Sequence, residues 1–217
     1  MPALLEDPVQ HLLGLLRSQP PRSMIGLVGV PGSGKSTLAM RLAEEVNACN
    51  PAHRMMALSM DGFHLTKAEL RQFPDPAQAF ARRGAPWTFD VGAFAQHVHA
   101  VRAAAGHAVV RWPAFEHAIG DPLPDALGVP ASTAVVLIEG LYLLHQEHGW
   151  AGVRQLFDEV WFLDTALEVS LERLALRHMQ AWGFTRAEAE ERIATNDGLN
   201  AQIVLESAGL AQWRVEG

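Results

Sequence analysis

Residues 29–36 read Gly-Val-Pro-Gly-Ser-Gly-Lys-Ser, and this short segment constrains the fold more than any other feature of the chain. It matches the pattern G-x-x-x-x-G-K-[ST], in which glycines let successive backbone N–H groups surround phosphate oxygens. An apolar run at residues 24–30 predicts a buried strand before the loop, and residues 35–47 predict a helix after it. A loop of this kind between a strand and a helix indicates a site for a nucleoside triphosphate.

The residue types in this loop predict distinct tasks. We expect Lys35 to reach the β- and γ-phosphates and the Ser36 hydroxyl to be a ligand of Mg²⁺. The chain has no guanine-reading N-K-x-D segment and no L-S-G-G-Q signature, which excludes switch GTPases and ABC-type ATPases. The residues expected to bind the nucleotide are Gly29, Pro31, Gly32, Ser33, Gly34, Lys35, Ser36 and Thr37.

The composition predicts a chain that buries a full hydrophobic core. Of the 217 residues, 49% are hydrophobic and 19% are charged, which excludes a disordered chain. No repeat or linker divides the sequence, so we expect a single domain over residues 1–217, with a helix at about 8–17. The formal net charge of −7 argues against nucleic acid as a partner.

Several features predict a cytoplasmic protein. The only cysteine, Cys49, cannot form an intrachain disulfide. The N-terminal segment contains Glu6 and Asp7 and lacks the basic stretch of a signal peptide. The longest run free of charged residues, 126–138, is shorter than the roughly 20 residues that a membrane span needs. We therefore expect no membrane partner.

Short apolar runs alternate with longer amphipathic segments, which predicts an α/β fold with a parallel sheet covered by helices on both faces. We expect further strands at residues 55–60, 108–112, 134–138, 160–163 and 210–215, the last at a sheet edge, and a loop at 120–130. We expect further helices at residues 76–82, 89–105, 166–181 and 186–196. Two of these helices begin with a capping box, Thr165 with Glu168 and Thr185 with Glu188.

Two acidic residues follow apolar strands. Asp61 opens the segment Asp-Gly-Phe-His after the strand at 55–60, and Glu139 ends the strand at 134–138. In a parallel sheet, ligands gather at the carboxyl ends of the strands. There Asp61 can accept the proton of an attacking hydroxyl, and Glu139 can orient a magnesium ion. The alternative for each carboxylate is to cap a helix or a turn.

The sequence resembles the phosphoribulokinase/uridine kinase family of P-loop kinases, which includes bacterial pantothenate kinase, over roughly residues 24–205. Within that family it looks closest to a set of small bacterial kinases described as nucleoside kinase-like or as fructose-transport-system kinases. It departs from uridine kinases at residues 112–117, which contain no tyrosine. The matching segments are residues 29–36, 61–64, 83–90, 139–144 and 196–200, in the family's order.

The resemblance implies a P-loop fold with a parallel core of five strands in the order 2-3-1-4-5 and a helical lid at about residues 170–190. It implies transfer of the γ-phosphoryl group of ATP to a hydroxyl of a small molecule, with Asp61 as catalytic base and Glu139 binding Mg²⁺. In the lid, Arg173 and Arg177 lie four residues apart and share one helix face. They would join Lys35 in neutralising charge on the transferred group, unless they belong to a solvated helix with salt bridges.

The residues before and after the helix at 76–82 predict the acceptor side of the site. We expect His64, Trp87 and Phe89 to line it, with packing in the core as the alternative for each. The guanidinium group of Arg83 suits a carboxylate or phosphate group of the acceptor. The alternative role is that Arg83 and Arg82 form a solvated basic pair.

The sequence leaves the acceptor open among sugars, nucleosides and pantothenate-like alcohols, and it leaves a homodimer open. The alternative function is that of a nucleotide-binding regulatory protein or a plain ATPase. Among the ten histidines, His145 and His148 can share a face, but no cysteine partner and no H-E-x-x-H pattern supports a zinc site. We therefore expect surface or packing roles for the histidines.

Overall fold

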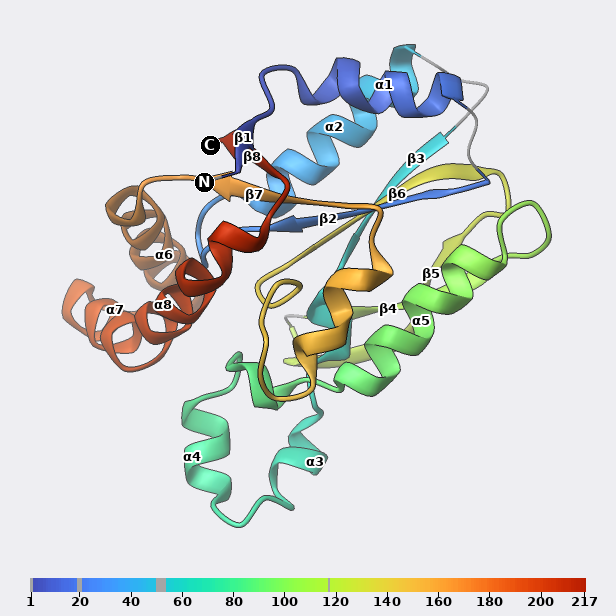
Figure 1. Cartoon of the computed structure of the whole chain (residues 1–217). Coiled ribbons are helices and arrows are strands. Elements are labelled where there is room, and N and C mark those ends of the chain that lie inside the picture. The colour runs from blue at the N-terminus through green and yellow to red at the C-terminus, as the bar shows by residue number, and fades with distance from the viewer. Residues whose placement is uncertain (1, 19–20, 50–53, 117) are drawn as a thin grey trace.

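A six-stranded parallel sheet lies at the centre of the molecule (Figure 1). The structure is a computed structural model that describes residues 2–18, 21–49, 54–116 and 118–217. All neighbouring strands of this sheet are parallel, as predicted. In spatial order the strands are β1 (Ala3–Leu4), β8 (Trp213–Glu216), β7 (Glu159–Asp164), β2 (Ser23–Val28), β6 (Thr133–Gly140) and β3 (Arg54–Ser59).

The longer strands of the sheet confirm the predicted order. Numbered along the chain, β2, β3, β6, β7 and β8 lie in the order 2-3-1-4-5. They correspond to the strands predicted at residues 24–30, 55–60, 134–138, 160–163 and 210–215. The prediction that residues 210–215 form the edge is wrong, because β1 pairs with β8 and is itself the edge strand. A strand of two residues is too short to leave a periodic pattern in the sequence.

Helices cover both faces of the sheet, as predicted (Figure 1). One face packs against α1 (Pro8–Ser18) and α2 (Lys35–Cys49). The other face packs against α5 (Val91–Ala103), the 3-10 helix η3 (Trp150–Leu156) and α8 (Gly198–Ser207). Burial on two sides explains why β2 and β6 are nearly continuous apolar runs rather than alternating ones.

A separate antiparallel hairpin is formed by β4 (Val110–Glu116) and β5 (Asp121–Val129). The strand predicted at residues 108–112 belongs to β4 and therefore lies outside the main sheet. The loop predicted at residues 120–130 is wrong, because residues 121–129 of this segment form β5. The prolines of β5 favoured a loop in the sequence, but proline is tolerated in an edge strand, and both strands of a two-stranded sheet are edges.

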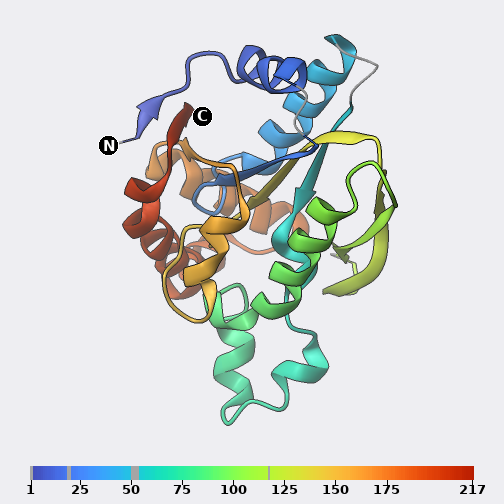
Figure 2. The ribbon, with the colours of Figure 1, turned by 45° about the vertical axis from the view of Figure 1, so that its right-hand side comes forward.

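The arm between β3 and α5 projects away from the sheet (Figure 2). It contains two short helices, α3 (Lys67–Leu70) and α4 (Pro76–Ala81). The first is missing from the sequence prediction, while the second confirms the helix expected at residues 76–82. The arm returns to the body of the protein through the 3-10 helix η2 (Pro86–Thr88), immediately before α5.

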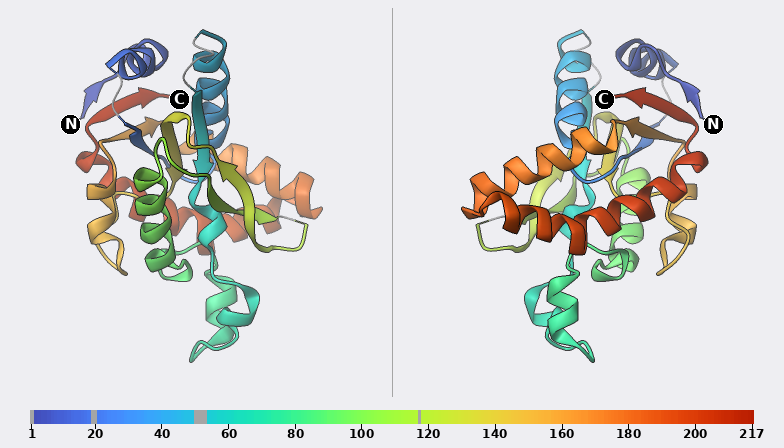
Figure 3. Two further views of the ribbon diagram at one scale, coloured as in Figure 1. Left: turned by 90° about the vertical axis from the view of Figure 1, so that its right-hand side faces the viewer. Right: turned by 90° about the vertical axis from the view of Figure 1, so that its left-hand side faces the viewer.

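Helices α6 (Leu167–Trp182) and α7 (Arg186–Arg192) lie side by side and span the segment predicted as a lid (Figure 3). They share a small apolar core of their own. A π-helical turn, Ile193–Asp197, joins α7 to α8, so the helix predicted at residues 186–196 continues further than expected. Of the helices that the structure describes, none is long and apolar enough to cross a membrane.

The two predicted capping boxes have different outcomes. The one formed by Thr185 and Glu188 at the start of α7 is confirmed. The one predicted for Thr165 and Glu168 is wrong, because the N-cap of α6 is Ala166 and no side chain caps it. The Thr165 hydroxyl instead donates to the carbonyl O of Ser33 at 3.0 Å. A tertiary hydrogen bond has taken the place of the local one.

Candidate active site

The glycine-rich loop connects the carboxyl end of β2 to α2, as predicted. Gly32 and Gly34 have φ angles of +79° and +94°, in the region that glycine adopts without strain. A Cβ atom on Gly32 would lie 2.2 Å from the carbonyl O of Ser170, so no larger residue fits there. At the start of α2, the amide of Leu38 donates to the carbonyl O of Gly34 at 2.9 Å. A tight turn that ends in a helix N-terminus is suited to binding an anion.

Ser33 fixes the loop against α6 and the segment before it. Its carbonyl O accepts hydrogen bonds from the Thr165 hydroxyl (3.0 Å) and from Nη1 of Arg173 (3.1 Å). Its own hydroxyl is buried and has no hydrogen-bond partner among the described residues. A buried hydroxyl without a partner costs free energy.

One hydrogen bond joins the end of the loop to β6. The Ser36 hydroxyl donates to Oε1 of Glu139 at 3.0 Å. Because β6 pairs with both β2 and β3, Glu139 lies beside the loop and is aligned with Ser59 at the end of β3. Glu139 is only 6% exposed. Burial raises the pKa of this carboxyl, the charge of Lys35 opposes the rise, and the charge of Asp61 adds to it.

Asp61 lies in the 3-10 turn η1 (Met60–Phe63), directly after β3, and is half-buried. The Ser59 hydroxyl caps this turn by accepting a hydrogen bond from the Asp61 amide at 3.1 Å. The capping task is therefore performed by Ser59. Within the described part of the chain, no hydrogen bond reaches the Asp61 carboxylate, and its charge acts on Glu139. The structure thus brings both acidic strand ends to the phosphate-binding loop.

The aromatic residues expected on the acceptor side differ in exposure. Nδ1 of His64 lies 2.8 Å from the carbonyl O of Asp61, and its ring packs against Phe89 with ring centroids 4.0 Å apart. Phe89 is 5% exposed and belongs to the main core. Trp87 is half-buried, and its ring centroid lies 5.6 Å from that of Phe73 on the arm. His64 and Trp87 keep accessible surface, whereas Phe89 has the packing role.

Arg83 contacts other parts of the protein through its guanidinium group. It donates to the carbonyl O atoms of Gly120 and Leu65 and to Oδ1 of Asp121, the last two at 2.8 Å. Burial raises the pKa of Asp121, but hydrogen bonds from the Lys67 amide and from Arg83 outweigh burial and hold that pKa below its ordinary value. Arg83 thus ties the arm to β5. The sequence missed Asp121 because it was expected in a loop.

The two arginines of the predicted lid have different surroundings. Nη1 of Arg173 donates to Ser33 and lies 3.6 Å from the position that a Cβ on Gly34 would take. Arg177 is exposed one turn further along α6, and among the described residues it has no hydrogen-bond or ion-pair partner. The structure brings Arg173 to the phosphate-binding loop and leaves Arg177 outside it.

A cavity of about 320 Å³ opens beside the loop. Its walls come from the loop, α2, the end of β7, α6 and the end of β8. Arg41 and Glu216 line it together with Thr37, and neither charged residue belongs to a motif that the sequence reveals. The full lining is Ser33, Gly34, Thr37, Leu38, Arg41, Leu163, Arg173, Glu216 and Gly217.

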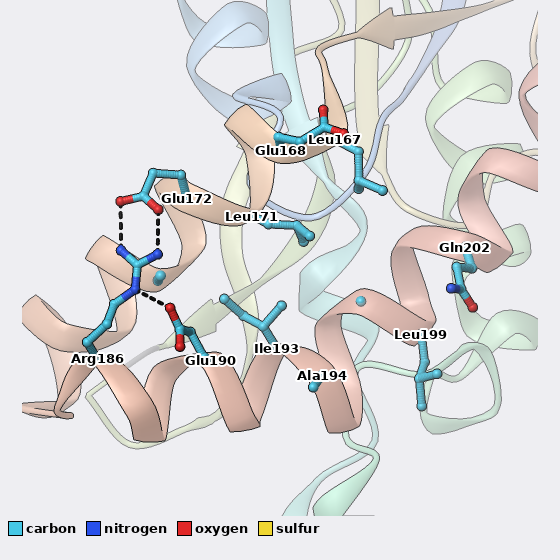
Figure 4. Close-up of a pocket in the computed structure, with 12 residues that line it drawn as sticks. Leu167, Glu168, Leu171, Glu172, Arg186, Glu190, Ile193, Ala194, Leu199 and Gln202 are labelled. Carbon is cyan, nitrogen blue, oxygen red and sulfur yellow. Dashed lines mark hydrogen bonds and ion pairs between the residues drawn. The ribbon is translucent and has the colours of Figure 1, made fainter.

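A groove of about 480 Å³ lies between α6 and the α7–α8 segment (Figure 4). Leu167 and Leu171 of α6 line it. At one end Arg186 forms ion pairs with Glu172 (2.7 Å) and Glu190 (2.6 Å), and all three side chains are about half exposed. Exposed ion pairs of this kind contribute little to stability.

A phosphate-binding loop on a parallel sheet of order 2-3-1-4-5, with a serine hydroxyl bonded to an acidic strand end, defines a P-loop nucleotide-binding fold. The chain belongs to the phosphoribulokinase/uridine kinase family, whose model it matches over residues 24–197. This finding confirms the resemblance seen in the sequence.

Individual relatives are similar over most of the chain. "Putative uridine kinase C227.14" of Schizosaccharomyces pombe is 38% identical over 184 residues, 84% of this chain and 78% of that protein. "ATP-dependent kinase-like protein notR'" of Aspergillus versicolor is 39% identical over 162 residues, 73% of this chain and 94% of that protein. The crystal structure of a "putative fructose transport system kinase" from Silicibacter sp. TM1040 has a TM-score of 0.83 at 30% identity, covering 96% of this chain and 98% of that one.

Proposed function

We propose that this protein transfers the γ-phosphoryl group of ATP to a hydroxyl group of a small molecule, with Mg²⁺ as cofactor. The observation that carries the proposal is the 3.0 Å hydrogen bond between Ser36 and Glu139 at the end of the phosphate-binding loop. Asp61 lies near enough to this pair for its charge to raise the pKa of Glu139. Membership in a family of kinases supports the same conclusion.

The residues present fit both cofactors. At Gly32 the loop has space for the backbone but for no side chain, and the loop ends at the N-terminus of α2, which suits an anion. The side-chain oxygen atoms of Ser36 and Glu139 are of the type that Mg²⁺ prefers as ligands. When bound, Mg²⁺ would neutralise charge on the β- and γ-phosphates. The cavity of about 320 Å³ beside Arg41 is a fitting place for the base and ribose of the nucleotide.

Each polar side chain of the site has a proposed task. Lys35 holds the β- and γ-phosphates, and Glu139 keeps the Ser36 hydroxyl in position for the metal. Asp61 accepts the proton of the acceptor hydroxyl and aligns its oxygen with the phosphorus. Arg173, already hydrogen-bonded to the loop, neutralises charge that develops on the transferred group.

We propose that the acceptor binds between Asp61 and the β4–β5 hairpin. His64 and Trp87 keep accessible surface on this side and can contact it. Arg83 forms an ion pair with Asp121. We therefore propose that Arg83 positions the hairpin and does not bind the acceptor directly. The printed names of two relatives, "Putative uridine kinase C227.14" and "putative fructose transport system kinase", support a nucleoside or a sugar as the acceptor class.

A metabolite screen tests the proposed function. The purified protein is incubated with ATP, Mg²⁺ and panels of sugars, nucleosides and pantothenate-like alcohols, and mass spectrometry detects phosphorylated products. We expect one chemical class of acceptor to raise the rate of ATP consumption well above the rate measured without an acceptor, and to yield a phosphate ester. ATP hydrolysis that no panel member raises would favour a plain ATPase, and the absence of any turnover would favour a regulatory nucleotide-binding protein.

A further inference from the structure

Three potential metal ligands converge in the loop between β6 and η3. One ligand atom from each of His145, Glu147 and His148 lies within 4.8 Å of the other two. The sequence did not favour these histidines as ligands, because no cysteine and no metalloprotease pattern accompanies them. The structure brings them together in a turn, and a turn of this kind has no signature in the sequence.

The backbone of the loop explains the convergence. The amide of His145 donates to the carbonyl O of Tyr142 at 2.9 Å, and the amide of Trp150 donates to the carbonyl O of Glu147 at 3.0 Å. Within the second of these turns, His148 has a φ angle of +52°, in a region that residues other than glycine rarely adopt. The chain reverses direction there, and the two imidazole rings lie stacked with centroids 6.0 Å apart.

His145 carries the second observation that points to a ligand. Its Nε2 atom is buried and has no hydrogen-bond partner among the described residues. Buried polar nitrogens are almost always paired, and a bound ion or an ordered water would supply the partner that this one lacks. The ligand cluster borders a pocket of about 220 Å³ that α8 completes with Ile203 and Glu206. The carboxylate of Glu206 adds negative charge to the pocket, which favours a cation.

We propose that His145, Glu147 and His148 bind one divalent transition-metal ion of the zinc type. Two imidazoles and one carboxylate form a donor set that zinc uses in proteins, with a fourth position left for water or another ligand. Imidazole ligands favour zinc and its neighbours over magnesium, which prefers oxygen ligands. The proposed site therefore differs in chemistry from the Ser36–Glu139 site, and no residue lining its pocket lines the cavity beside the phosphate-binding loop.

Metal titration of the untagged protein tests this proposal. The protein is first treated with a chelator, which is then removed, and is titrated with zinc chloride by calorimetry in excess Mg²⁺. We expect one equivalent of zinc to bind. Substitution His148→Asn or Glu147→Gln should weaken binding by about tenfold or more, because each removes one of three ligands. With cobalt in place of zinc, the visible absorption spectrum should show nitrogen coordination, and His148→Asn should change it.

The substitutions that test zinc binding lie at exposed positions, so they should not disturb the fold. Glu147 and His148 are exposed, so their substitution should leave the thermal unfolding of the metal-free protein unchanged. His99, exposed on α5, supplies the matched control, and His99→Asn should bind zinc as the parent does. Zinc affinity that is the same in the parent, His148→Asn and His99→Asn would overturn the proposal. A parent protein that binds no zinc would overturn it as well.

Discussion

The Ser36 hydroxyl donates a hydrogen bond of 3.0 Å to Oε1 of Glu139, although 103 positions separate the two residues in the chain. The parallel pairing of β2 with β6 creates this contact, because it places the end of β6 beside the loop that follows β2. The contact joins the phosphate-binding motif to the second acidic strand end. The proposed metal chemistry of the kinase depends on it.

Replacing Glu139 tests this contact. We expect Glu139→Gln to lower kcat by about 10²–10³-fold and to raise the Mg²⁺ concentration needed for half-maximal activity, because a neutral amide holds the cation poorly. The measurement is the steady-state rate across a magnesium titration. Glu44→Gln, an exposed substitution on α2, should leave both quantities unchanged. An unchanged magnesium requirement in Glu139→Gln would show that Glu139 has no part in binding the ion.

Asp61 is predicted to act on the acceptor and not on the nucleotide. We therefore expect Asp61→Asn to keep the Kd for ATP within about twofold of the parent value while turnover falls by about 10²–10⁴-fold. Calorimetry measures the first quantity, and product formation with the identified acceptor measures the second. Turnover at the parent rate would remove Asp61 from the role of catalytic base.

The two arginines of α6 form a matched pair. Both side chains are exposed, but Arg173 is hydrogen-bonded to the loop, whereas Arg177 lies one turn away from it. We expect Arg173→Ala to lower kcat by about tenfold more than Arg177→Ala does. In the parent protein the Arg177 side chain must move further than that of Arg173 before it can neutralise charge on the phosphates. Steady-state kinetics of both variants measure the difference. A larger loss in Arg177→Ala would indicate that the lid closes with Arg177 over the phosphates.

Asp121 is predicted to stabilise the joint between the arm and β5. Asp121→Asn weakens the charge-assisted bonds to Arg83 and to the Lys67 amide, so the free energy of unfolding should fall by about 1–3 kcal/mol. Urea denaturation measures this quantity. Asp125 is exposed on the same strand with a φ angle of +55°, which asparagine also tolerates, so Asp125→Asn should change it little.

The pH dependence of the same variant has a definite sign. In the folded protein the pKa of Asp121 lies below its ordinary value. The stabilisation is therefore complete above the unfolded-state pKa, near about 4, and is lost as the pH falls through the lower folded-state pKa. Below about pH 4, the parent should lose stability more steeply than Asp121→Asn. Acid limbs of equal slope would contradict this account.

Local patterns predicted the elements that depend on neighbouring residues in the sequence. The loop at residues 29–36, the strand ends at Asp61 and Glu139 and the capping box at Thr185 all follow from short-range chemistry. The order of the sheet followed from the family resemblance and is confirmed. These features locate the candidate site.

The features that the sequence did not reveal are tertiary. Thr165 caps no helix because its hydroxyl bonds to Ser33, and β5 was hidden because its prolines suit a loop as well as an edge strand. The structural role of Asp121 depends on its ion pair with Arg83, which is distant in the sequence. His145 and His148 come together only because a turn brings their side chains close. In each case the contact that determines the role of the residue forms only in the folded protein and leaves no periodic pattern in the sequence.

The destination of the γ-phosphoryl group is the most direct test of the proposed kinase activity. The protein is incubated with ATP labelled with ¹⁸O on the γ-phosphate, Mg²⁺ and the acceptor that the screen selects, and the products are analysed by mass spectrometry. We expect the labelled phosphoryl group in an ester of the acceptor hydroxyl, formed only when the acceptor is present. Label that appears solely in inorganic phosphate, at a rate independent of every acceptor, would contradict transfer to a small-molecule alcohol.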